Sequence, residues 1–352
     1  MIYEYWFARM KNISDNKKKK LREAYGSAKE IYYIEETRLR LQNFLTEKDI
    51  EQLKIARKQK DLAEKYYNME EKGIDFVPYF QKTYPKRLSE LDGAPYALYV
   101  KGKLPDASKL SVAVVGARNC TPYGRDMARM FSYRLAVAGV FVISGMALGI
   151  DGWGHQGALE AGGETYAVLG SGVMQCYPLC HQNLYESIIR HGGVISEFPV
   201  YARAKPVFFP MRNRIISGLS DGILVVEARE KSGSLITADA ALEQGKDVFV
   251  IPGRIGDELS VGCNRLIRMG AVPVLTPDDI LDYYGVKTSD GSRNVNETEQ
   301  KILAFLGGKT MHMDEISAGL SLPMTQLLKC MIVLQKKGYV IEVGRNFFMK
   351  KI

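Results

Sequence analysis

The chain has 352 residues, of which 46% are hydrophobic and 25% are charged, and this composition is typical of a soluble globular protein with two or three domains. No secretory signal is predicted, because the first residues lead into a lysine-rich stretch. No membrane helix is predicted either, because the apolar run at residues 135–150 is broken by glycines and shorter than the roughly 18 residues of a span. Five cysteines are an odd number, which argues against a disulfide framework and for a reducing, cytoplasmic compartment.

The net charge of +8 is concentrated at the two ends of the chain. Residues 1–72 contain 17 Lys and Arg against 13 Asp and Glu, and residues 289–352 contain 9 against 6, whereas the residues between them contain 22 against 21. A binding site for a polyanion in the middle of the chain must therefore be a local cluster of cations.

Residues 1–72 are predicted to form a small helical domain. Residues 53–67 are expected to be one helix, and an earlier set of apolar residues also follows helical spacing. That set is Ile31, Ile34, Leu39, Leu41, Phe44 and Leu45. The lysine run at residues 17–20 favours a solvated helix face over a dedicated nucleic-acid patch. Residues 74–102 are less regular, because three prolines interrupt them.

The repeated strand–turn–helix pattern of residues 110–285 predicts a doubly wound α/β domain. We expect the whole domain to extend from residue 73 to residue 288. Seven apolar, mostly β-branched runs are expected to be strands, at 111–115, 140–143, 165–169, 194–196, 222–226, 247–251 and 271–275. Helix-like stretches such as 124–138 and 236–243 fill most of the gaps. Continuous apolar strands separated by helices indicate a parallel sheet with both faces covered.

Small residues follow four of these strands, at Gly116 with Arg118, at Ser144-Gly145, at Gly170-Ser171-Gly172 and at Ser232-Gly233-Ser234. Ligands of parallel sheets bind at the carboxyl ends of the strands. Glycine and serine let a backbone approach a ligand there, and helix N-termini attract anions. Together with Arg212 and Arg214, these junctions predict a phosphate-rich ligand.

The C-terminal part predicts a linker over 289–296 and a winged-helix domain over 297–352. Helices are expected at 297–306, 314–319 and 323–335, followed by a hairpin of strands 339–343 and 346–349. The third helix is expected to bury Leu327, Leu328, Met331 and Leu334. It carries few basic residues near its start, chiefly Lys329, so a protein-interaction role and a weak DNA-binding role both remain open.

Three patterns that look like cofactor or metal sites are incomplete. Residues 308–310 lack the first glycine of a P-loop, and residues 170–172 lack the third glycine of a dinucleotide-binding loop, where Gln175 stands. Cys176, Cys180 and His181 lack a second pair of metal ligands. No cofactor, metal or catalytic residue is therefore expected. His155 is either catalytic or a hydrogen-bonded structural imidazole, and the second interpretation is favoured.

In their order and spacing, the motifs of this chain resemble those of the DNA-processing protein A family (DprA, also called Smf). The resemblance covers nearly the whole chain. Its motifs are Tyr84-Pro85, Leu-Tyr-Val-Lys-Gly at 98–102, Val-Val-Gly-Ala-Arg at 114–118, Ser-Gly-Met-Ala-Leu-Gly-Ile-Asp at 144–151, Phe-Pro-Met-Arg-Asn-Arg at 209–214, Ser-Gly-Ser-Leu-Ile-Thr at 232–237 and Pro252-Gly253. The resemblance implies an extended Rossmann-like domain between a helical domain and a winged helix, and the winged helix is variable in the family.

The resemblance also implies a function. Proteins of this family bind single-stranded DNA, form homodimers and load the RecA recombinase onto strands taken up in natural transformation. They act by binding and not as enzymes. Single-strand binding needs cations for the phosphates and flat groups for the bases, which agrees with the residues found at the strand ends.

The DNA-binding residues expected from the motifs are of three kinds. The cationic and amide residues are Arg118, Lys205, Arg212, Asn213 and Arg214, and the stacking residues are Phe208 and Phe209. The loop residues are Gly116, Gly124, Ser144, Gly145, Gly170, Gly172, Gly233 and Ser234. Two structural interpretations stay open. In one, Phe209 is a core residue, and in the other, Arg214 pairs with Glu227. The family usually has a lysine where this chain has Pro206, so Lys205, one residue earlier, departs from the pattern.

The alternative is an enzyme like the phosphoribohydrolases of nucleoside monophosphates, which share Gly-rich loops on a Rossmann-like sheet. Those enzymes carry a Pro-Gly-Gly-x-Gly-Thr loop that leads to a glutamate. This chain has Ser-Gly-Ser-Leu-Ile-Thr at 232–237, followed by Asp239 and Glu243. The larger side chains would crowd a nucleotide pocket, which favours binding over catalysis.

Overall fold

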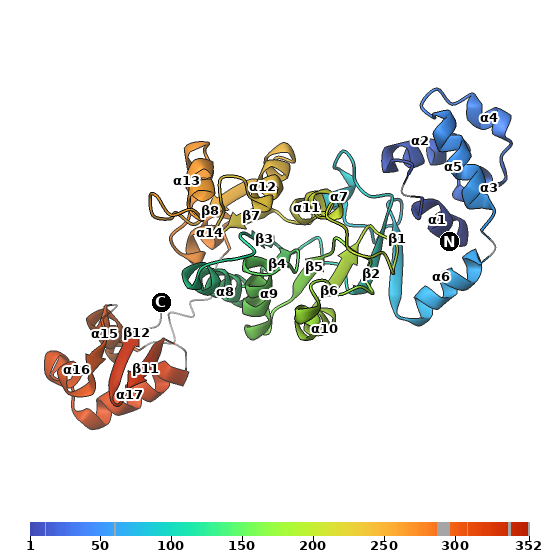
Figure 1. Ribbon diagram of the computed structural model, residues 1–352. Helices are drawn as coiled ribbons and strands as arrows, with labels where there is room; N and C mark the ends of the chain where they lie inside the picture. Colours follow the sequence, from blue (N-terminus) through green and yellow to red (C-terminus); the bar gives the residue numbers. More distant parts are fainter. Residues whose placement is uncertain (11, 60, 287–295, 308, 337–338, 351–352) are drawn as a thin grey trace. The chain divides into compact units, whose positions relative to one another are not determined.

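The computed structural model describes residues 1–350 except 11, 60, 287–295, 308, 337 and 338. The chain divides into two compact units, residues 1–286 and residues 287–352 (Figure 1). Most of the expected linker, residues 289–295, lies outside the described residues. The first unit holds both the expected helical domain and the expected central domain, so the boundary at residue 72 stays a prediction.

The first unit is built on a nine-stranded sheet with the order β1-β2-β6-β5-β4-β3-β7-β8-β9. Its strands are β1 (Ile74–Pro78), β2 (Ala97–Gly102), β3 (Ser111–Val115), β4 (Phe141–Ser144), β5 (Thr165–Val168), β6 (Gly193–Ser196), β7 (Gly222–Val225), β8 (Asp247–Val250) and β9 (Val272–Pro273). The seven strands from β3 to β9 pair in parallel and confirm the seven expected strands, with small differences at their ends.

Two antiparallel strands, β1 and β2, were not expected. They pair with each other, and β2 pairs with β6, so they extend one edge of the sheet. The prolines in residues 74–102 lie at the end of β1 and in the connection to β2, which explains why this segment lacks a clear strand pattern.

Helices cover both faces of the sheet, as expected for a doubly wound domain (Figure 1). They are α7 (Lys86–Ser89), α8 (Pro122–Val137), α9 (Ile150–Glu160), α10 (Gln182–His191), α11 (Phe208–Leu219), α12 (Gly233–Glu243), α13 (Val261–Arg268) and α14 (Pro277–Tyr283), with a 3-10 turn at Leu179–His181. Alternate residues of β3 enter opposite cores. Val112 and Val114 pack with α8, α9 and α14, whereas Ala113 and Val115 pack with α7, α11, α12 and α13.

The N-terminal helices are α1 (Ile2–Ala8), α2 (Asp15–Tyr25), α3 (Ala28–Tyr33), α4 (Glu36–Arg40), α5 (Glu47–Arg57) and α6 (Leu62–Glu71). The single helix expected over 53–67 was wrong, because α5 ends and α6 begins within that range. These helices share an aromatic core with the sheet, in which Phe7 packs edge-on against Tyr96. The hydroxyl of Tyr96 donates a hydrogen bond to the buried carboxylate of Glu4.

The lysine run of α2 is not a simple solvated face. Lys17 pairs with Asp49 across 2.6 Å, and Lys18 is fully buried, where it pairs with Asp15 at 2.9 Å. The expectation of a solvated face was therefore wrong for Lys18, because its ammonium is held by a carboxylate and by the carbonyl of Ala8.

The second unit contains α15 (Glu297–Leu306), β10 (Met311–His312), α16 (Met313–Leu320), α17 (Met324–Lys336), β11 (Val340–Gly344) and β12 (Phe347–Lys350). The expected hairpin is confirmed, since β11 and β12 pair antiparallel, and β10 adds a third strand. Leu328 was wrongly expected to be buried; it is 51% exposed, while Leu327, Met331 and Leu334 form the core. The winged-helix assignment stays a prediction.

Among the described residues, no single helix is long and apolar enough to cross a membrane. The bent pair Met313–Leu320 and Met324–Gln335 reaches that length and composition only when both helices are taken together.

Candidate nucleic-acid interface

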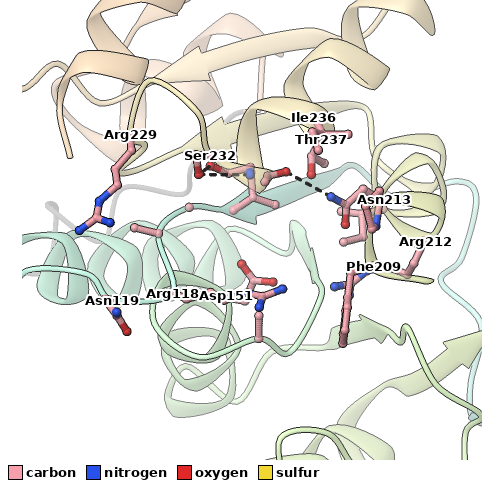
Figure 2. Close-up of a pocket in the computed structure, with 18 of the residues that line it drawn as sticks. Arg118, Asn119, Asp151, Phe209, Arg212, Asn213, Arg229, Ser232, Ile236 and Thr237 are labelled. Atoms are coloured by element: carbon pink, nitrogen blue, oxygen red, sulfur yellow. Dashed lines mark hydrogen bonds between the residues drawn. The ribbon is translucent and has the colours of Figure 1, made fainter. Parts of the chain in front are cut away.

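A pocket of about 500 Å³ opens at the carboxyl ends of β3 and β7. These two strands are neighbours, but the chain passes through β4, β5 and β6 on one side before it returns to β7 on the other. The pocket thus lies where the strand order reverses, which is where open α/β sheets bind ligands. Segments after β3, β4 and β7 and the first turns of α11 and α12 line it (Figure 2).

The lining of the pocket is cationic. It includes Arg118, Arg212, Arg229 and Lys231, with Asp151 as the one carboxylate among the residues that line it. Arg229 and Lys231 were missed in the sequence, although they directly precede the small-residue loop at 232–234. Arg229 is held by Glu258 at 3.2 Å, whereas Lys231 is exposed on the loop that follows β7. Such an excess of cations favours an anionic ligand.

One side of the pocket joins a cation to aromatic rings. The guanidinium of Arg118, which is exposed, lies 5.2 Å from the ring centroid of Phe209. The Phe209 ring is only partly buried, and the ring of Tyr177 lies 5.5 Å from it at a tilt of 41°. Phe209 therefore lines the pocket and is not a core residue. Tyr177, 49% exposed, was missed because no strand-end pattern marks it.

Arg212 is buried in the floor of the pocket, with 3% of its surface exposed. Its guanidinium donates to the carbonyl of Val168 and lies against Gly145, where a Cβ atom would collide with it. Burial lowers the pKa of Arg212 to about 10, an effect that the nearby Asp151 opposes. Arg212 is therefore still charged at neutral pH, but it reaches a ligand only through the pocket floor.

Asp151 is the buried counter-charge of this floor. Its carboxylate accepts a hydrogen bond from the backbone N–H of Gly145 at 3.1 Å. Burial raises the pKa of Asp151, while the charge of Arg212 and backbone hydrogen bonds act in the opposite direction. The pair fixes the loop after β4 beneath the pocket.

The start of α12 forms the wall opposite the floor. Ser232 is the N-cap, and its hydroxyl lies 2.7 Å from that of Ser234. The side-chain amide of Asn213 donates to the carbonyl of Gly233 at 3.3 Å and so ties α11 to this turn (Figure 2). A helix start with exposed Gly233 beside cationic side chains suits a phosphate.

Of the fifteen residues expected from the motifs, the pocket brings together Gly116, Arg118, Phe209, Arg212, Asn213, Gly233 and Ser234. The other loop residues have structural partners. Ser144 is buried and donates to the carbonyl of Val114, and Gly124 lies against the carboxylate of Glu227. Gly170 lies under the ring of Phe209, and the N–H of Gly172 donates to Ala202.

Three expected contact residues point elsewhere. The ring of Phe208 stacks on the buried Phe198 at 4.1 Å, and Lys205 lies 5.7 Å from the Phe208 ring, outside the pocket. Arg214 does not line the pocket either, because it pairs with the buried Glu197 at 2.6 Å. The suggested pairing of Arg214 with Glu227 was also wrong.

Glu227 instead serves the start of α8. Its carboxylate accepts hydrogen bonds from the backbone N–H and the hydroxyl of Thr121, the N-cap of that helix.

His155 has a structural environment. It is fully buried, and its Nδ1 lies 2.7 Å from the hydroxyl of Thr165. Burial lowers its pKa to about 3, so the ring is neutral in the folded protein.

Comparison with known proteins places the chain in a family. The model of the DNA recombination-mediator protein A family matches residues 75–285. Protein Smf of Escherichia coli K12 is 36% identical over 292 residues, which cover 79% of this chain and 78% of that protein. An X-ray structure of DNA processing protein A (DprA) from Streptococcus pneumoniae aligns with a TM-score of 0.70 and 32% identity, over 80% of this chain and 97% of that one.

A second solved structure, of DNA processing protein A from Helicobacter pylori, aligns with a TM-score of 0.54 and 27% identity, over 60% of this chain and 95% of that one. The Helicobacter protein is described as having a unique single-stranded DNA binding mode. The family model covers more than half of this chain, and a relative above 30% identity is matched over more than two thirds of it. The chain belongs to the DNA recombination-mediator protein A family, which includes the proteins called DprA and Smf.

Proposed function

We propose that the pocket binds single-stranded DNA, with Arg118 and Lys231 on phosphates and Phe209 and Tyr177 against bases. The observation that carries this proposal is the exposed Arg118 guanidinium 5.2 Å from the Phe209 ring. A cation beside a flat apolar face matches both parts of a nucleotide, and single-strand binding proteins combine these two groups. Single-stranded DNA binding by the Helicobacter pylori relative supports the choice of ligand.

The experiment is fluorescence anisotropy of a labelled oligonucleotide, single- and double-stranded, across a salt series. Arg118→Ala should weaken binding to any single-stranded sequence and lower the salt slope by about one unit. Arg190→Ala is a matched control. Arg190 lies in the last turn of α10, which leads into β6, and so it lies at the amino ends of the strands, whereas the pocket lies at their carboxyl ends. Absence of binding at low salt, or equal loss in both variants, would overturn the proposal.

A further part of the proposal concerns what the bound strand is used for. The protein would act as a homodimer that protects incoming single strands and loads the RecA recombinase on them during natural transformation. The family's description as a recombination mediator supports this role. A strand-exchange assay with RecA tests it: the wild type should shorten the lag before exchange, and Arg118→Ala should not.

The phosphoribohydrolase alternative has less support. Glu243, the carboxylate it would need, is the last residue of α12 and is exposed. The part of that helix that lines the pocket ends at Thr237, and at about 1.5 Å per residue Glu243 lies roughly 9 Å further along the helix axis. Asp151, the carboxylate inside the pocket, is buried and already bonded to the backbone.

A further inference from the structure

A second cavity, of about 580 Å³, lies in the first unit between the N-terminal helices and the segment that leads from β6 to α11. Its residues from the helices are Tyr5, Arg9, Asp61, Glu64, Lys65, Asn68, Met69 and Lys72, and those from the β6–α11 segment are Pro199, Val200, Tyr201 and Ala202. The same segment contributes Pro206, and α11 contributes Phe209, to the first pocket. One stretch of backbone therefore borders both cavities.

Cation–aromatic pairs recur along this stretch. The ammonium of Lys72 lies 5.1 Å from the ring centroid of Tyr201 and bonds its hydroxyl at 2.5 Å. At the other end of the stretch, the Arg118–Phe209 pair lies in the first pocket. The same two chemical groups, a cation and a flat ring, are thus present in both cavities. Such repetition suits a polymer of charged and flat units.

The path between the two cavities is short and positively charged. Arg203 and Lys205 are both exposed in the β6–α11 segment. From Ala202 in one cavity to Pro206 in the other, even a fully extended chain spans at most about 15 Å. A strand held in the first pocket therefore needs only a few further nucleotides to reach the second cavity.

The second cavity offers an unused donor for an anion. The Nη1 atom of Arg9 is buried and has no hydrogen-bond partner among the described residues. A buried donor without a partner is costly, and an anionic ligand would satisfy it. Asp61 is already paired with Lys65, whereas the exposed Glu64 lines the cavity and would repel a phosphate. The phosphate is thus expected beside Lys72 and Arg9.

We propose that this cavity is a second nucleotide subsite, at which a single strand that leaves the first pocket places a base on Tyr201 and a phosphate near Lys72. This inference rests on the proposed single-strand binding by the first pocket. It predicts that strand length decides which residues matter. A strand of about four nucleotides fills the first pocket alone, whereas one of about twenty engages both cavities.

The test measures the affinity of a short and a long oligonucleotide for wild type and Tyr201→Ala. Tyr201 is 52% exposed, so its removal should leave the fold intact. The variant should bind the long strand about five- to tenfold more weakly and the short strand equally well. Tyr67→Ala is the matched control, because Tyr67 is 54% exposed on α6 but does not line the cavity. It should bind both strands like the wild type.

A second variant should act in the opposite direction. Glu64→Gln removes a negative charge from the lining of the cavity and should tighten binding of the long strand, about two- to threefold at low salt, without changing the short one. A thymidine analogue placed beyond the first nucleotides and activated by light should also crosslink to Tyr201 in the long complex.

The outcomes separate the two proposals. If the short strand binds and Arg118→Ala weakens it, but Tyr201→Ala and Glu64→Gln leave the long strand unchanged, the second subsite is refuted and the first pocket stands. If neither strand responds to Arg118→Ala, the proposed function itself fails. Saturable binding of a free mononucleotide that depends on Tyr201, with no effect of Tyr201 on the long strand, would also overturn the strand path.

Discussion

The guanidinium of Arg118 lies 5.2 Å from the ring centroid of Phe209, although the first residue follows β3 and the second opens α11. The fold brings them together because the loop after β3 and the start of α11 meet at the same edge of the sheet. Arg118 is not paired with a carboxylate among the described residues, and both side chains line the pocket. The pair therefore presents its charge and its ring to a ligand.

Phe209→Leu should weaken single-strand binding by about 1 kcal/mol, roughly fivefold, because leucine keeps the apolar volume but removes the flat face. Phe209→Tyr should bind nearly as well as the wild type, since it keeps the ring. Anisotropy titrations with one oligonucleotide at fixed salt measure both. Equal affinity of the leucine variant and the wild type would exclude stacking on Phe209.

The neighbouring Phe208 supplies the control. Its ring stacks on Phe198 at 4.1 Å and does not line the pocket. Phe208→Leu should lower the free energy of unfolding by about 1 kcal/mol, which appears as a lower urea midpoint. It should leave the affinity for single strands unchanged. A loss of affinity without a loss of stability would instead place Phe208 on the strand.

Arg212→Met should chiefly destabilise the protein. The side chain is 3% exposed, and its charge offsets that of the buried Asp151. Removing one member of a buried charge pair costs about 3 kcal/mol, because the other charge stays buried. Urea denaturation measures this loss. The salt slope of strand binding should change less than in Arg118→Ala, since Arg212 lies in the pocket floor.

The double variant Arg212→Met, Asp151→Asn tests the cause of that loss. An asparagine oxygen still accepts from the N–H of Gly145, but the buried charge is gone. The double variant should therefore be more stable than Arg212→Met alone, by about 1 kcal/mol or more. Additive losses would show that Asp151 and Arg212 do not interact.

The sequence predicted the central fold well, because buried parallel strands are continuous apolar runs between small-residue turns. All seven expected strands are present, and β3 has the expected bounds, Ser111–Val115. The edge strands β1 and β2 were missed, since antiparallel pairing at an edge leaves a weaker and proline-broken pattern. The split between α5 and α6 was missed because the residues between them, 58–61, include no glycine or proline to mark the end of a helix.

The candidate site was predicted only in outline. Strand ends carry small residues both where a ligand approaches and where the backbone passes close to a side chain, and the sequence does not separate the two cases. Gly145 and Gly170 belong to the second case, since they lie against Arg212 and Phe209. The three arginines are likewise alike in the sequence but not in the structure. Arg118 is exposed, Arg212 is buried, and Arg214 is paired with the carboxylate of Glu197.

Gly170→Ala and Gly233→Ala should differ in stability. A Cβ atom at Gly170 would lie 2.8 Å from the Phe209 ring, whereas one at Gly233 would meet nothing within 4 Å. We expect the first change to cost about 1 kcal/mol or more, through overpacking, and the second to be neutral or to stabilise by up to about 1 kcal/mol. Urea unfolding compares them, and equal destabilisation would contradict this account of the loops.

His155 should make the stability of the first unit depend on pH. Burial holds its pKa at about 3, well below the usual value near 6.5 that applies in the unfolded chain. Between these two pH values the unfolded state binds one more proton than the folded state, so stability rises with pH. The contribution is complete above about pH 6.5 and is lost as the pH falls towards 3.

From pH 7 to pH 5 this one group should lower the free energy of unfolding by about 2 kcal/mol. Urea unfolding of the wild type and of His155→Gln at both pH values isolates the effect, because glutamine does not titrate. The variant should be less stable at pH 7, since it loses the hydrogen bond between Nδ1 and Thr165. The gap between the two proteins should then narrow at pH 5. A gap that stays constant would mean that the imidazole of His155 is hydrated and titrates normally in the folded protein.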